Sequence, residues 1–224
     1  DTVNAEGASG AVTFTIAEDA LNAGDTLTGG TGSDIMSITF DGGSGITSAE
    51  MAGITGIETI KSATNVVGSL VLSDNNNVSS NLAVDVSANT GSTKTFTLNA
   101  SAENDGNINY TGATTAVDTV TGTATTATGD TISTGGGADV ITGAGGGDTI
   151  TGGTGADTFT YTAVADSTGS ARDSITDFTS GTDKFSFTIN NSTNTTGQTY
   201  DATVQTARAG TSVVQSNLSG SIGQ

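Results

Sequence analysis

The chain contains no cysteine, no histidine and no proline, and each absence removes a class of structure or chemistry. Without cysteine, neither a disulfide framework nor a thiolate metal site is possible. Without histidine, Ser-His-Asp and Cys-His catalysis and the usual zinc ligand sets are excluded. Without proline, no turn is fixed by a pyrrolidine ring, so the 33 glycines must provide the tight turns.

Basic residues and long apolar segments are also scarce. Five Lys and Arg residues stand against 23 Asp and Glu residues, which gives a net charge of −18. Such a surface repels nucleic acid and anionic membranes and attracts multivalent cations. No apolar run approaches the roughly 20 residues that a membrane span needs. The sequence therefore predicts neither nucleic-acid binding nor membrane insertion. It predicts either a disordered chain or one that folds when a cation neutralises it.

Helical periodicity is limited to residues 16–23 and 47–54, each of which could form two turns. Elsewhere Val, Ile, Thr and Phe alternate with small polar residues in runs of four to six, a pattern typical of short strands. Gly, Asn and Asp separate these runs, as tight turns require. Many short strands with regular turns indicate either a sandwich or a solenoid, and the spacing of repeats decides between them.

Four aspartates, Asp130, Asp139, Asp148 and Asp157, follow one another at intervals of nine residues. A large apolar residue follows each of them by two positions, and glycine-rich turns lie between them. Residues 152–160 match the nonapeptide G-G-x-G-x-D-x-U-x, in which U is a large apolar residue, at every fixed position. Six residues would form a turn and three a strand, so that two repeats close one coil. This spacing predicts that Asp130 pairs with Asp148, and Asp139 with Asp157.

A calcium ion suits such turns, because Ca²⁺ takes six to eight oxygen ligands at about 2.3–2.6 Å. Two stacked turns could supply several backbone carbonyls and two carboxylates, and glycine allows the carbonyls to turn toward the ion. Mg²⁺ is disfavoured, because it retains its waters. The alternative is a turn repeat without metal. The predicted ligand positions in this segment are Asp130, Gly135, Gly137, Asp139, Gly145, Gly146, Asp148, Gly152, Gly153, Gly155 and Asp157.

A second nonapeptide covers residues 29–37, and residues 20–28 form a degenerate copy before it. A calcium turn is predicted here too, although position 52, eighteen residues after Asp34, is an alanine. Asp41 would therefore have to complete the site after an insertion. The predicted ligand positions of this turn are Asp25, Gly29, Gly30, Gly32 and Asp34.

Between the two nonapeptide segments, apolar runs begin about every 12 to 14 residues, with Asn- and Asp-rich tips between them. We interpret them as coils of a parallel β-helix that continue into the calcium roll, and an antiparallel sandwich is the alternative. Acidic tips such as residues 103–105 are interpreted as solvated turns. The runs are residues 57–60, 70–72, 82–84, 96–98 and 108–110, and Val120.

These motifs resemble the RTX (repeats-in-toxin) family of proteins exported by type I secretion. Residues 152–187 are similar to the carboxy-terminal calcium roll and cap of serralysin-type proteases. Residues 21–60 resemble a module of large bacterial surface-layer and adhesin proteins. The resemblance implies a roll that stays unfolded inside the cell and folds outside, with a secretion signal near the carboxy terminus. In the closing segment, Asp173 and Asp177 are expected to be calcium ligands or turn caps rather than a catalytic carboxylate pair.

The serralysin protease domain carries an H-E-x-x-H zinc motif, which a chain without histidine cannot contain. No P-loop and no G-x-S-x-G motif is present either. The sequence therefore predicts a non-enzymatic, all-β protein, a parallel β-helix and β-roll solenoid with calcium-binding nonapeptide turns. Its expected function is that of a structural component of a secreted bacterial surface layer or extracellular filament, folded and assembled by calcium. The alternative is a non-catalytic RTX secretion and folding module of a larger secreted enzyme, toxin or adhesin.

Four regions are expected along the chain. They are an N-terminal module with a calcium turn (1–56), β-helix coils (57–124), the calcium roll with its closing segment (125–188) and a C-terminal tail (189–224). The expected location is outside the cell or at its surface. The expected partners are further copies of the chain, in a lattice or filament, and cell-surface polysaccharide.

Overall fold

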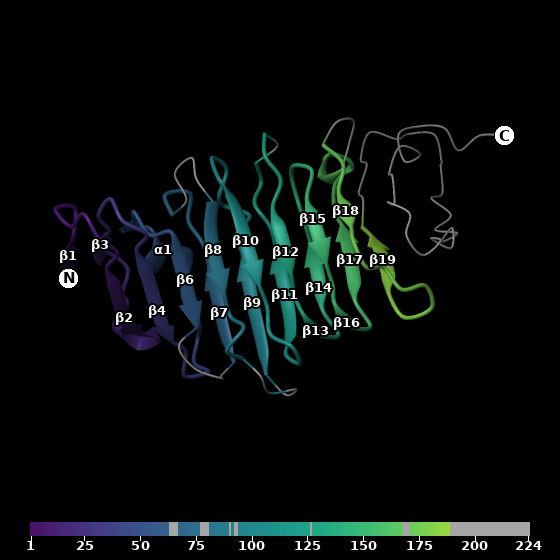
Figure 1. The fold of residues 1–224 in the computed structure, drawn as a ribbon, viewed down its shortest axis with the longest axis horizontal. Coiled ribbons are helices and arrows are strands. Elements are labelled where there is room, and N and C mark those ends of the chain that lie inside the picture. Colours follow the sequence, from purple (N-terminus) through teal and green to yellow (C-terminus); the bar gives the residue numbers. More distant parts are fainter. Residues whose placement is uncertain are drawn as a thin grey trace.

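The chain forms a parallel β-solenoid. The computed structural model describes residues 1–62, 67–76, 81–89, 91, 94–125, 127–167 and 171–188. In Figure 1 the coils follow one another along the long axis, from the N-terminal to the C-terminal end, and make about seven turns. Every strand pairing within these residues is parallel, including β2 with β4 and β17 with β19. The predicted solenoid is thus confirmed, and the antiparallel sandwich is excluded.

Two sheets contain most of the strands, and two small sheets lie beside them. The eight-stranded sheet has the order β18 (Ser174–Ile175), β15 (Thr149–Thr151), β12 (Thr131–Ser133), β10 (Asn107–Thr111), β8 (Asn81–Asp85), β6 (Thr59–Ser62), β4 (Ile35–Thr39), β2 (Thr13–Ala17). The six-stranded sheet has the order β19 (Lys184–Phe187), β17 (Thr158–Tyr161), β14 (Val140–Thr142), β11 (Val117–Thr121), β9 (Thr95–Asn99), β7 (Gly68–Val71). The small sheets are β1 (Thr2–Asn4), β3 (Thr26–Thr28) and β5 (Ile54–Thr55), and β13 (Gly136–Gly137) with β16 (Thr154–Gly155).

The length of a coil changes along the solenoid. In the nonapeptide segment β12 aligns Ile132 with Ile150 of β15, so that one coil contains 18 residues, as the repeat predicts. Earlier coils are longer, since β8 aligns Leu82 with Ile108 of β10, 26 residues later. Each apolar run predicted in the middle of the chain coincides with a strand. Two such runs make one coil, because successive strands belong alternately to the two large sheets.

The core is a stack of apolar side chains enclosed by the coils. Side chains alternate between the inside and the outside of each strand, as the pleat of a strand requires. Ile132, Ile141 and Phe159 are at most 1% exposed. In the middle coils the ring of Phe96 packs edge-on against Phe40, with 5.4 Å between the centroids. Burial of apolar area, at about 25 cal/mol per Å², is therefore the main attraction that holds the coils together.

Helical structure is short. The helix α1 (Ser48–Met51) begins at a capping box, in which the Thr47 hydroxyl accepts the Glu50 N–H and the Glu50 carboxylate accepts the Thr47 N–H. The 3₁₀ turns are η1 (Glu18–Ala20) and η2 (Val164–Asp166). The helix predicted for residues 16–23 is wrong at its start, because Ile16 pairs with Ile38 of β4 and strand pairing overrides the local pattern. No helix among the described residues is long and apolar enough to cross a membrane.

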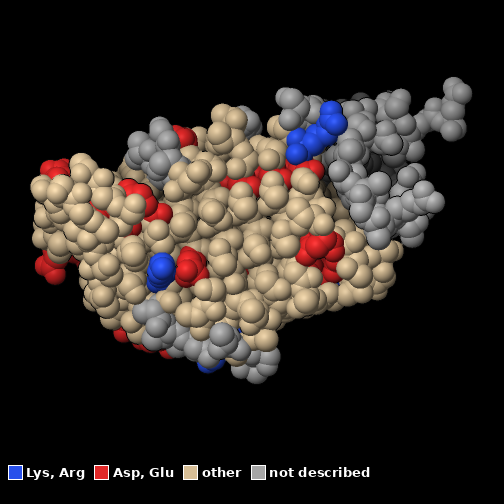
Figure 2. All heavy atoms as spheres, in the orientation of Figure 1, with Lys and Arg blue, Asp and Glu red and all other residues tan. Residues whose placement is uncertain are grey.

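The charged surface reflects the acidic composition. On the face shown in Figure 2, the charged atoms are mostly acidic and lie among a larger area of uncharged side chains. Lys61 of β6 lies beside Asp85 of β8, with 3.9 Å between Nζ and Oδ2. Such an exposed pair contributes about 0–1 kcal/mol to stability. The five basic residues of the chain thus leave a net charge of −18.

The eight-stranded sheet extends across the boundaries expected after residues 56 and 124, since it contains both β4 and β6 and both β10 and β12. The division into regions 1–56, 57–124 and 125–188 stays a prediction. The expected tail, residues 189–224, lies outside the described residues.

Candidate metal centre

Buried aspartates are stacked where strands of the eight-stranded sheet begin. The Asp130 N–H donates to Oδ1 of Asp148 (2.8 Å), and the Asp148 N–H donates to Oδ1 of Asp173 (3.0 Å). At the start of the series, the Ile108 N–H donates to Asp130 (2.9 Å). The three aspartates are at most 5% exposed. We call Asp130, Asp148 and Asp173 the first carboxylate ladder.

A second carboxylate ladder follows the six-stranded sheet and consists of Asp118, Asp139, Asp157 and Asp183. The Asp118 N–H donates to Asp139 (2.8 Å) and the Asp139 N–H to Asp157 (3.0 Å). The Asp157 N–H donates to Asp183 (3.1 Å). The structure thus pairs Asp130 with Asp148 and Asp139 with Asp157, as the nine-residue interval predicts.

The local sequence explains why these carboxylates lie inside. Each begins an acid-x-apolar triplet, and alternation along a strand places its first and third side chains on the same face. In the triplet that starts at Asp139, Val140 is 38% exposed and Ile141 only 1%. The apolar residue fills the core, and the aspartate on the same face of the strand is buried with it. The hydrogen bond that the carboxylate accepts from the preceding coil offsets part of the cost of that burial.

The turns between the ladders bring the backbones of neighbouring coils together. Gly137 and Gly155 pair in β13 and β16 and have φ of 143° and 141°, which L side chains rarely adopt. A Cβ on Gly155 would lie 1.4 Å from the carbonyl oxygen of Gly137. Only glycine can occupy this position at so close an approach. The other predicted turn glycines with positive φ are Gly135, Gly146 and Gly153.

One oxygen of most ladder carboxylates lacks a hydrogen-bond partner. Among the described residues this holds for Oδ2 of Asp139, Asp148, Asp157 and Asp173, and for both oxygens of Asp118. A buried carboxylate oxygen without a partner costs free energy, and such oxygens are ligands that Ca²⁺ prefers. The chemistry of these oxygens therefore fits the predicted ion.

Glycines provide the space beside these oxygens. A Cβ on Gly152 would lie 2.5 Å from Oδ2 of Asp157, and one on Gly143 would lie 2.1 Å from Oδ2 of Asp148. Gly145 lies against the preceding turn, where a Cβ would meet the Ala124 carbonyl oxygen at 2.8 Å. Within the described part of the chain, no three acidic side chains come close enough to form a metal site by themselves. Backbone carbonyls would have to provide most of the ligands.

Burial opposes the negative charge of the ladders. It raises the pKa of Asp118 to about 7, that of Asp130 and of Asp173 to about 6, and that of Asp148 to about 8. For Asp148, the neighbouring carboxylates of Asp173 and Asp130 add to the rise. Burial also raises the pKa of Asp139 and that of Asp157. A cation beside these groups would favour their ionised form and would thereby couple ion binding to folding.

The two aspartates of the closing segment have different roles. Asp173 belongs to the first carboxylate ladder, and its own N–H donates to the Ser167 hydroxyl (3.0 Å). Asp177 lies outside both ladders and accepts the N–H groups of Gly152 (3.1 Å) and Gly153 (2.6 Å). Asp177 therefore caps the glycine turn of the preceding coil.

The predicted N-terminal turn contains a carboxylate whose oxygens both have partners. Asp34 is fully buried, and its oxygens accept the N–H groups of Val12 (2.7 Å) and Gly30 (2.5 Å). The Asp34 N–H donates to the Glu58 carboxylate (2.7 Å), so this arrangement resembles a ladder. Its geometry offers less to a metal ion than the roll does, since neither oxygen of Asp34 lacks a donor.

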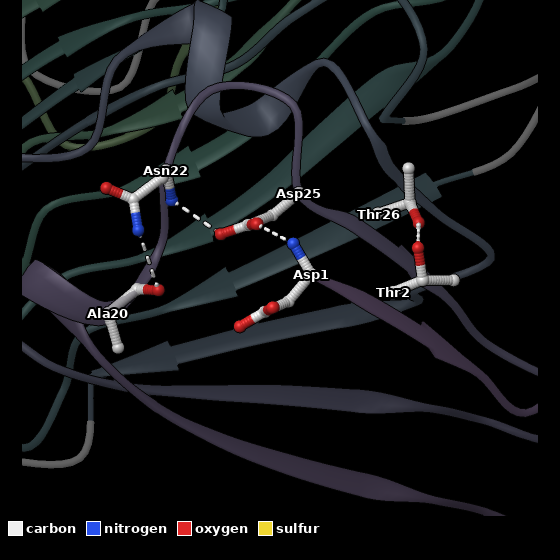
Figure 3. Close-up of polar contacts among 6 residues, drawn as sticks. All are labelled: Asp1, Thr2, Ala20, Asn22, Asp25 and Thr26. Atoms are coloured by element: carbon white, nitrogen blue, oxygen red, sulfur yellow. Dashed lines mark hydrogen bonds and ion pairs between the residues drawn. The ribbon is translucent and has the colours of Figure 1, made fainter.

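The structure does not bring Asp25 to Asp34. Asp25 precedes β3 of the three-stranded sheet, whereas Asp34 precedes β4 of the eight-stranded sheet. Figure 3 shows the Asp25 carboxylate between the amino group of Asp1 and the N–H of Asn22 (2.8 Å). The hydrogen bond from the amino terminus, together with that from Asn22, lowers the pKa of Asp25.

The remaining predicted residues of this turn pack against other coils. The Gly29 N–H donates to the Thr55 carbonyl (2.9 Å), and a Cβ on Gly32 would lie 2.6 Å from the Gly10 carbonyl carbon. The hypothesis that Asp41 completes the site is wrong. Strand β4 separates it from Asp34, and its N–H donates to Glu18 (3.0 Å) at the other end of that strand.

Three acidic residues of these stacks were not predicted from the nine-residue interval: Glu58, Asp118 and Asp183. Asp118 lies 12 residues before Asp130, because the intervening turn is longer than in the nonapeptide. Each of the three nevertheless begins an acid-x-apolar triplet, as in Asp118-Thr119-Val120. The triplet, rather than the interval, is the signal that finds them.

A family model described as Peptidase M10 serralysin C terminal matches residues 14–217. Comparisons with curated proteins and with solved structures gave no match. The matched family is the non-catalytic, carboxy-terminal repeat region of serralysin-type proteases, and it is a calcium-binding and secreted family. The match covers most of the chain and agrees with its solenoid fold. The chain belongs to the Peptidase M10 serralysin C terminal family and is an RTX-type β-roll protein.

Proposed function

We propose that this chain is the non-catalytic, calcium-dependent folding and secretion module of a larger protein that acts outside the cell. One observation carries the proposal: two ladders of buried carboxylates keep oxygens without partners beside glycine turns, in a chain of this family. The family match favours this function over that of a surface-layer subunit.

The proposed ligands are carboxylate oxygens of the ladders and backbone carbonyls of the glycine turns. One carboxylate oxygen lacks a donor in Asp139, Asp148, Asp157 and Asp173, whereas both oxygens of Asp130 accept hydrogen bonds. They comprise the ladder members Asp130, Asp139, Asp148, Asp157 and Asp173, with the turn glycines Gly135, Gly137, Gly145, Gly146, Gly152, Gly153 and Gly155. Bound calcium supplies positive charge that neighbouring carboxylates share. The N–H groups of one coil orient the carboxylates of the next, and the apolar stack excludes water from them.

The net charge of −18 explains why such a module responds to calcium. At low calcium concentration, repulsion among the acidic residues opposes compaction, and buried carboxylates without partners add to the cost of folding. At millimolar calcium outside the cell, ligand binding to the folded state offsets both costs. A chain that stays unfolded inside the cell is also suited to export as an extended polypeptide.

A second candidate function is the structural one, in a surface layer or extracellular filament. The observation that favours it is the open edge of the eight-stranded sheet, where β2 pairs with β4 alone within the described sheets. Exposed edges are sites where further strands add, unless they are covered or charged. Under this hypothesis the partners are copies of the chain, bridged by calcium, or cell-surface polysaccharide.

The proposed function is tested by titrating the complete 224-residue chain with calcium and recording far-ultraviolet circular dichroism. We expect β-structure to appear cooperatively with calcium and to be lost on chelation, whereas Mg²⁺ at the same concentration has little effect. The variant Asp148→Asn should need more calcium for the same signal, and the exposed control Asp19→Asn should not. An unchanged spectrum between chelator and millimolar calcium contradicts the proposal.

A further inference from the structure

The turn after β9 contains a buried glutamate that belongs to neither carboxylate ladder. Glu103 is 0% exposed, and neither of its carboxylate oxygens has a hydrogen-bond partner among the described residues. The sequence predicts a solvated turn for residues 103–105, and for Glu103 this prediction is wrong. A fully buried carboxylate without a donor is rare in folded proteins and points to a missing ligand.

The backbone of Glu103 is held by its own turn and by the next coil. Its N–H donates to the Ala100 carbonyl (2.9 Å), and its carbonyl accepts the N–H of Ala124 (2.9 Å). On the other side, the Leu72 N–H donates to the Asn99 carbonyl (2.9 Å), so the turn after β7 lies alongside. These contacts fix the turn, and the buried side chain cannot reach solvent unless the turn opens.

Corresponding turns of other coils satisfy their buried polar side chain internally. After β7, the Asn76 amide donates to the carbonyls of Met51 (2.8 Å) and Ile54 (2.9 Å). After β17, the Asp166 carboxylate accepts the N–H groups of Thr162 (2.7 Å) and Ala163 (2.9 Å). The Glu103 carboxylate accepts no comparable pair of hydrogen bonds, and the group of its own turn that influences it most is Asp105, whose carboxylate is itself negative. The turn therefore does not neutralise the buried charge.

The charges nearest to Glu103 are also negative. Burial raises the pKa of Glu103, and the Asp105 and Asp74 carboxylates raise it further. Asp105 belongs to the same turn and Asp74 to the turn after β7, and both side chains are exposed. One buried carboxylate therefore lies next to two exposed ones, with no basic group among the residues that influence it.

We propose that Glu103 and Asp105 bind a divalent cation of the calcium type in the turn after β9, with Asp74 at its rim. This turn offers carboxylate, backbone carbonyl and Asn104 side-chain oxygens, and Ca²⁺ accepts six to eight such oxygens. No three acidic side chains of the described residues form a metal site alone, so carbonyls and water complete the ligand shell. This site goes beyond the proposed function, because the coil matches no nonapeptide. It makes the β-helix coils depend on calcium as well as the roll.

The test counts the calcium ions bound to the complete chain by native mass spectrometry at saturating calcium. We expect Glu103→Gln and Asp105→Asn each to bind one ion fewer than the unaltered protein. The matched control Glu6→Gln, which changes an exposed glutamate, should bind the same number. Hydrogen exchange of residues 100–106 should slow on adding calcium in the control and not in the two variants.

An unchanged ion count in Glu103→Gln overturns the inference. If that variant does not fold, Asp105→Asn decides, because its exposed side chain is not part of the core. Asp148→Asn separates this inference from the proposed function. Loss of an ion there, with none lost in the other two variants, refutes the Glu103 site alone. An unaltered protein that binds no calcium refutes both.

Discussion

The backbone N–H of Asp130 donates to the carboxylate of Asp148 over 2.8 Å, across two adjacent coils. Every ladder carboxylate except that of Asp118 thus accepts an N–H group of the preceding coil and fixes the register of the two coils. In most of them the second oxygen has no partner. A hydrogen bond to a charged group contributes about 1.5–3 kcal/mol, and this partly offsets the burial of the charge. The side chains that fix the register of the coils are therefore the ones proposed to bind calcium.

Substitutions at Asp139 and Ile141 should separate the ligand positions from the core positions. Asp139→Ala removes both the acceptor of the Asp118 N–H and the free oxygen, so the number of bound calcium ions should fall. Ile141→Ala opens a cavity at a residue that is 1% exposed and should cost about 2–5 kcal/mol. The number of calcium ions bound by Ile141→Ala should not change. Isothermal titration calorimetry and urea unfolding in calcium measure the two effects, and identical results for both variants contradict the distinction.

The metal-free protein should lose stability as the pH rises from about 4 to 8. The pKa of Asp118 is raised to about 7 and that of Asp148 to about 8, from a usual value of 3.8. The folded state therefore holds protons that the unfolded chain releases, and the cost of ionising buried carboxylates grows until the folded-state pKa is passed. In chelator, circular dichroism should record more β-structure at pH 5 than at pH 7.5, and the difference should be smaller in Asp148→Asn. β-structure that increases with pH in chelator contradicts this expectation.

Three glycine-to-alanine substitutions should show what the turns require. Gly155→Ala combines a φ of 141° with a Cβ 1.4 Å from the Gly137 carbonyl oxygen. Gly181 has a φ of 89°, but a methyl group added there would meet open space. Gly7 also has open space around it and does not have a positive φ. In thermal unfolding with calcium, Gly181→Ala should cost about 1–2 kcal/mol. Gly155→Ala should cost more, and Gly7→Ala should cost nothing. Equal stability of Gly155→Ala and Gly181→Ala would show that the coils separate easily at the turn.

Assembly distinguishes the two candidate functions. If the chain is a surface-layer or filament subunit, light scattering should detect association in calcium that chelator reverses. Monovalent salt should only weaken it, since salt screens charge but does not bridge carboxylates. A folding module should remain a monodisperse monomer at every calcium concentration. The second result would exclude the structural candidate for this segment.

The sequence predicts the solenoid because the nine-residue interval aligns Asp130 with Asp148 and sets Ile132 on Ile150. It also predicts the strands in the middle of the chain, because each of them contains one apolar run. It does not reveal the burial of Glu103, because that depends on contacts with the coils on either side. Asp118 was missed because its turn is longer than a nonapeptide, and Ile16 was assigned to a helix because strand pairing with β4 is not local.

The most direct test of the account is amide hydrogen exchange of residues 118–187 in millimolar calcium and in chelator at the same pH. The ladder amides of Asp130, Asp139 and Asp148 donate to carboxylates whose second oxygens lack partners. We expect strong protection of these amides in calcium and its loss in chelator, because unopposed repulsion then separates the coils. Equal protection in both conditions would contradict the claim that the carboxylate ladders couple calcium binding to folding.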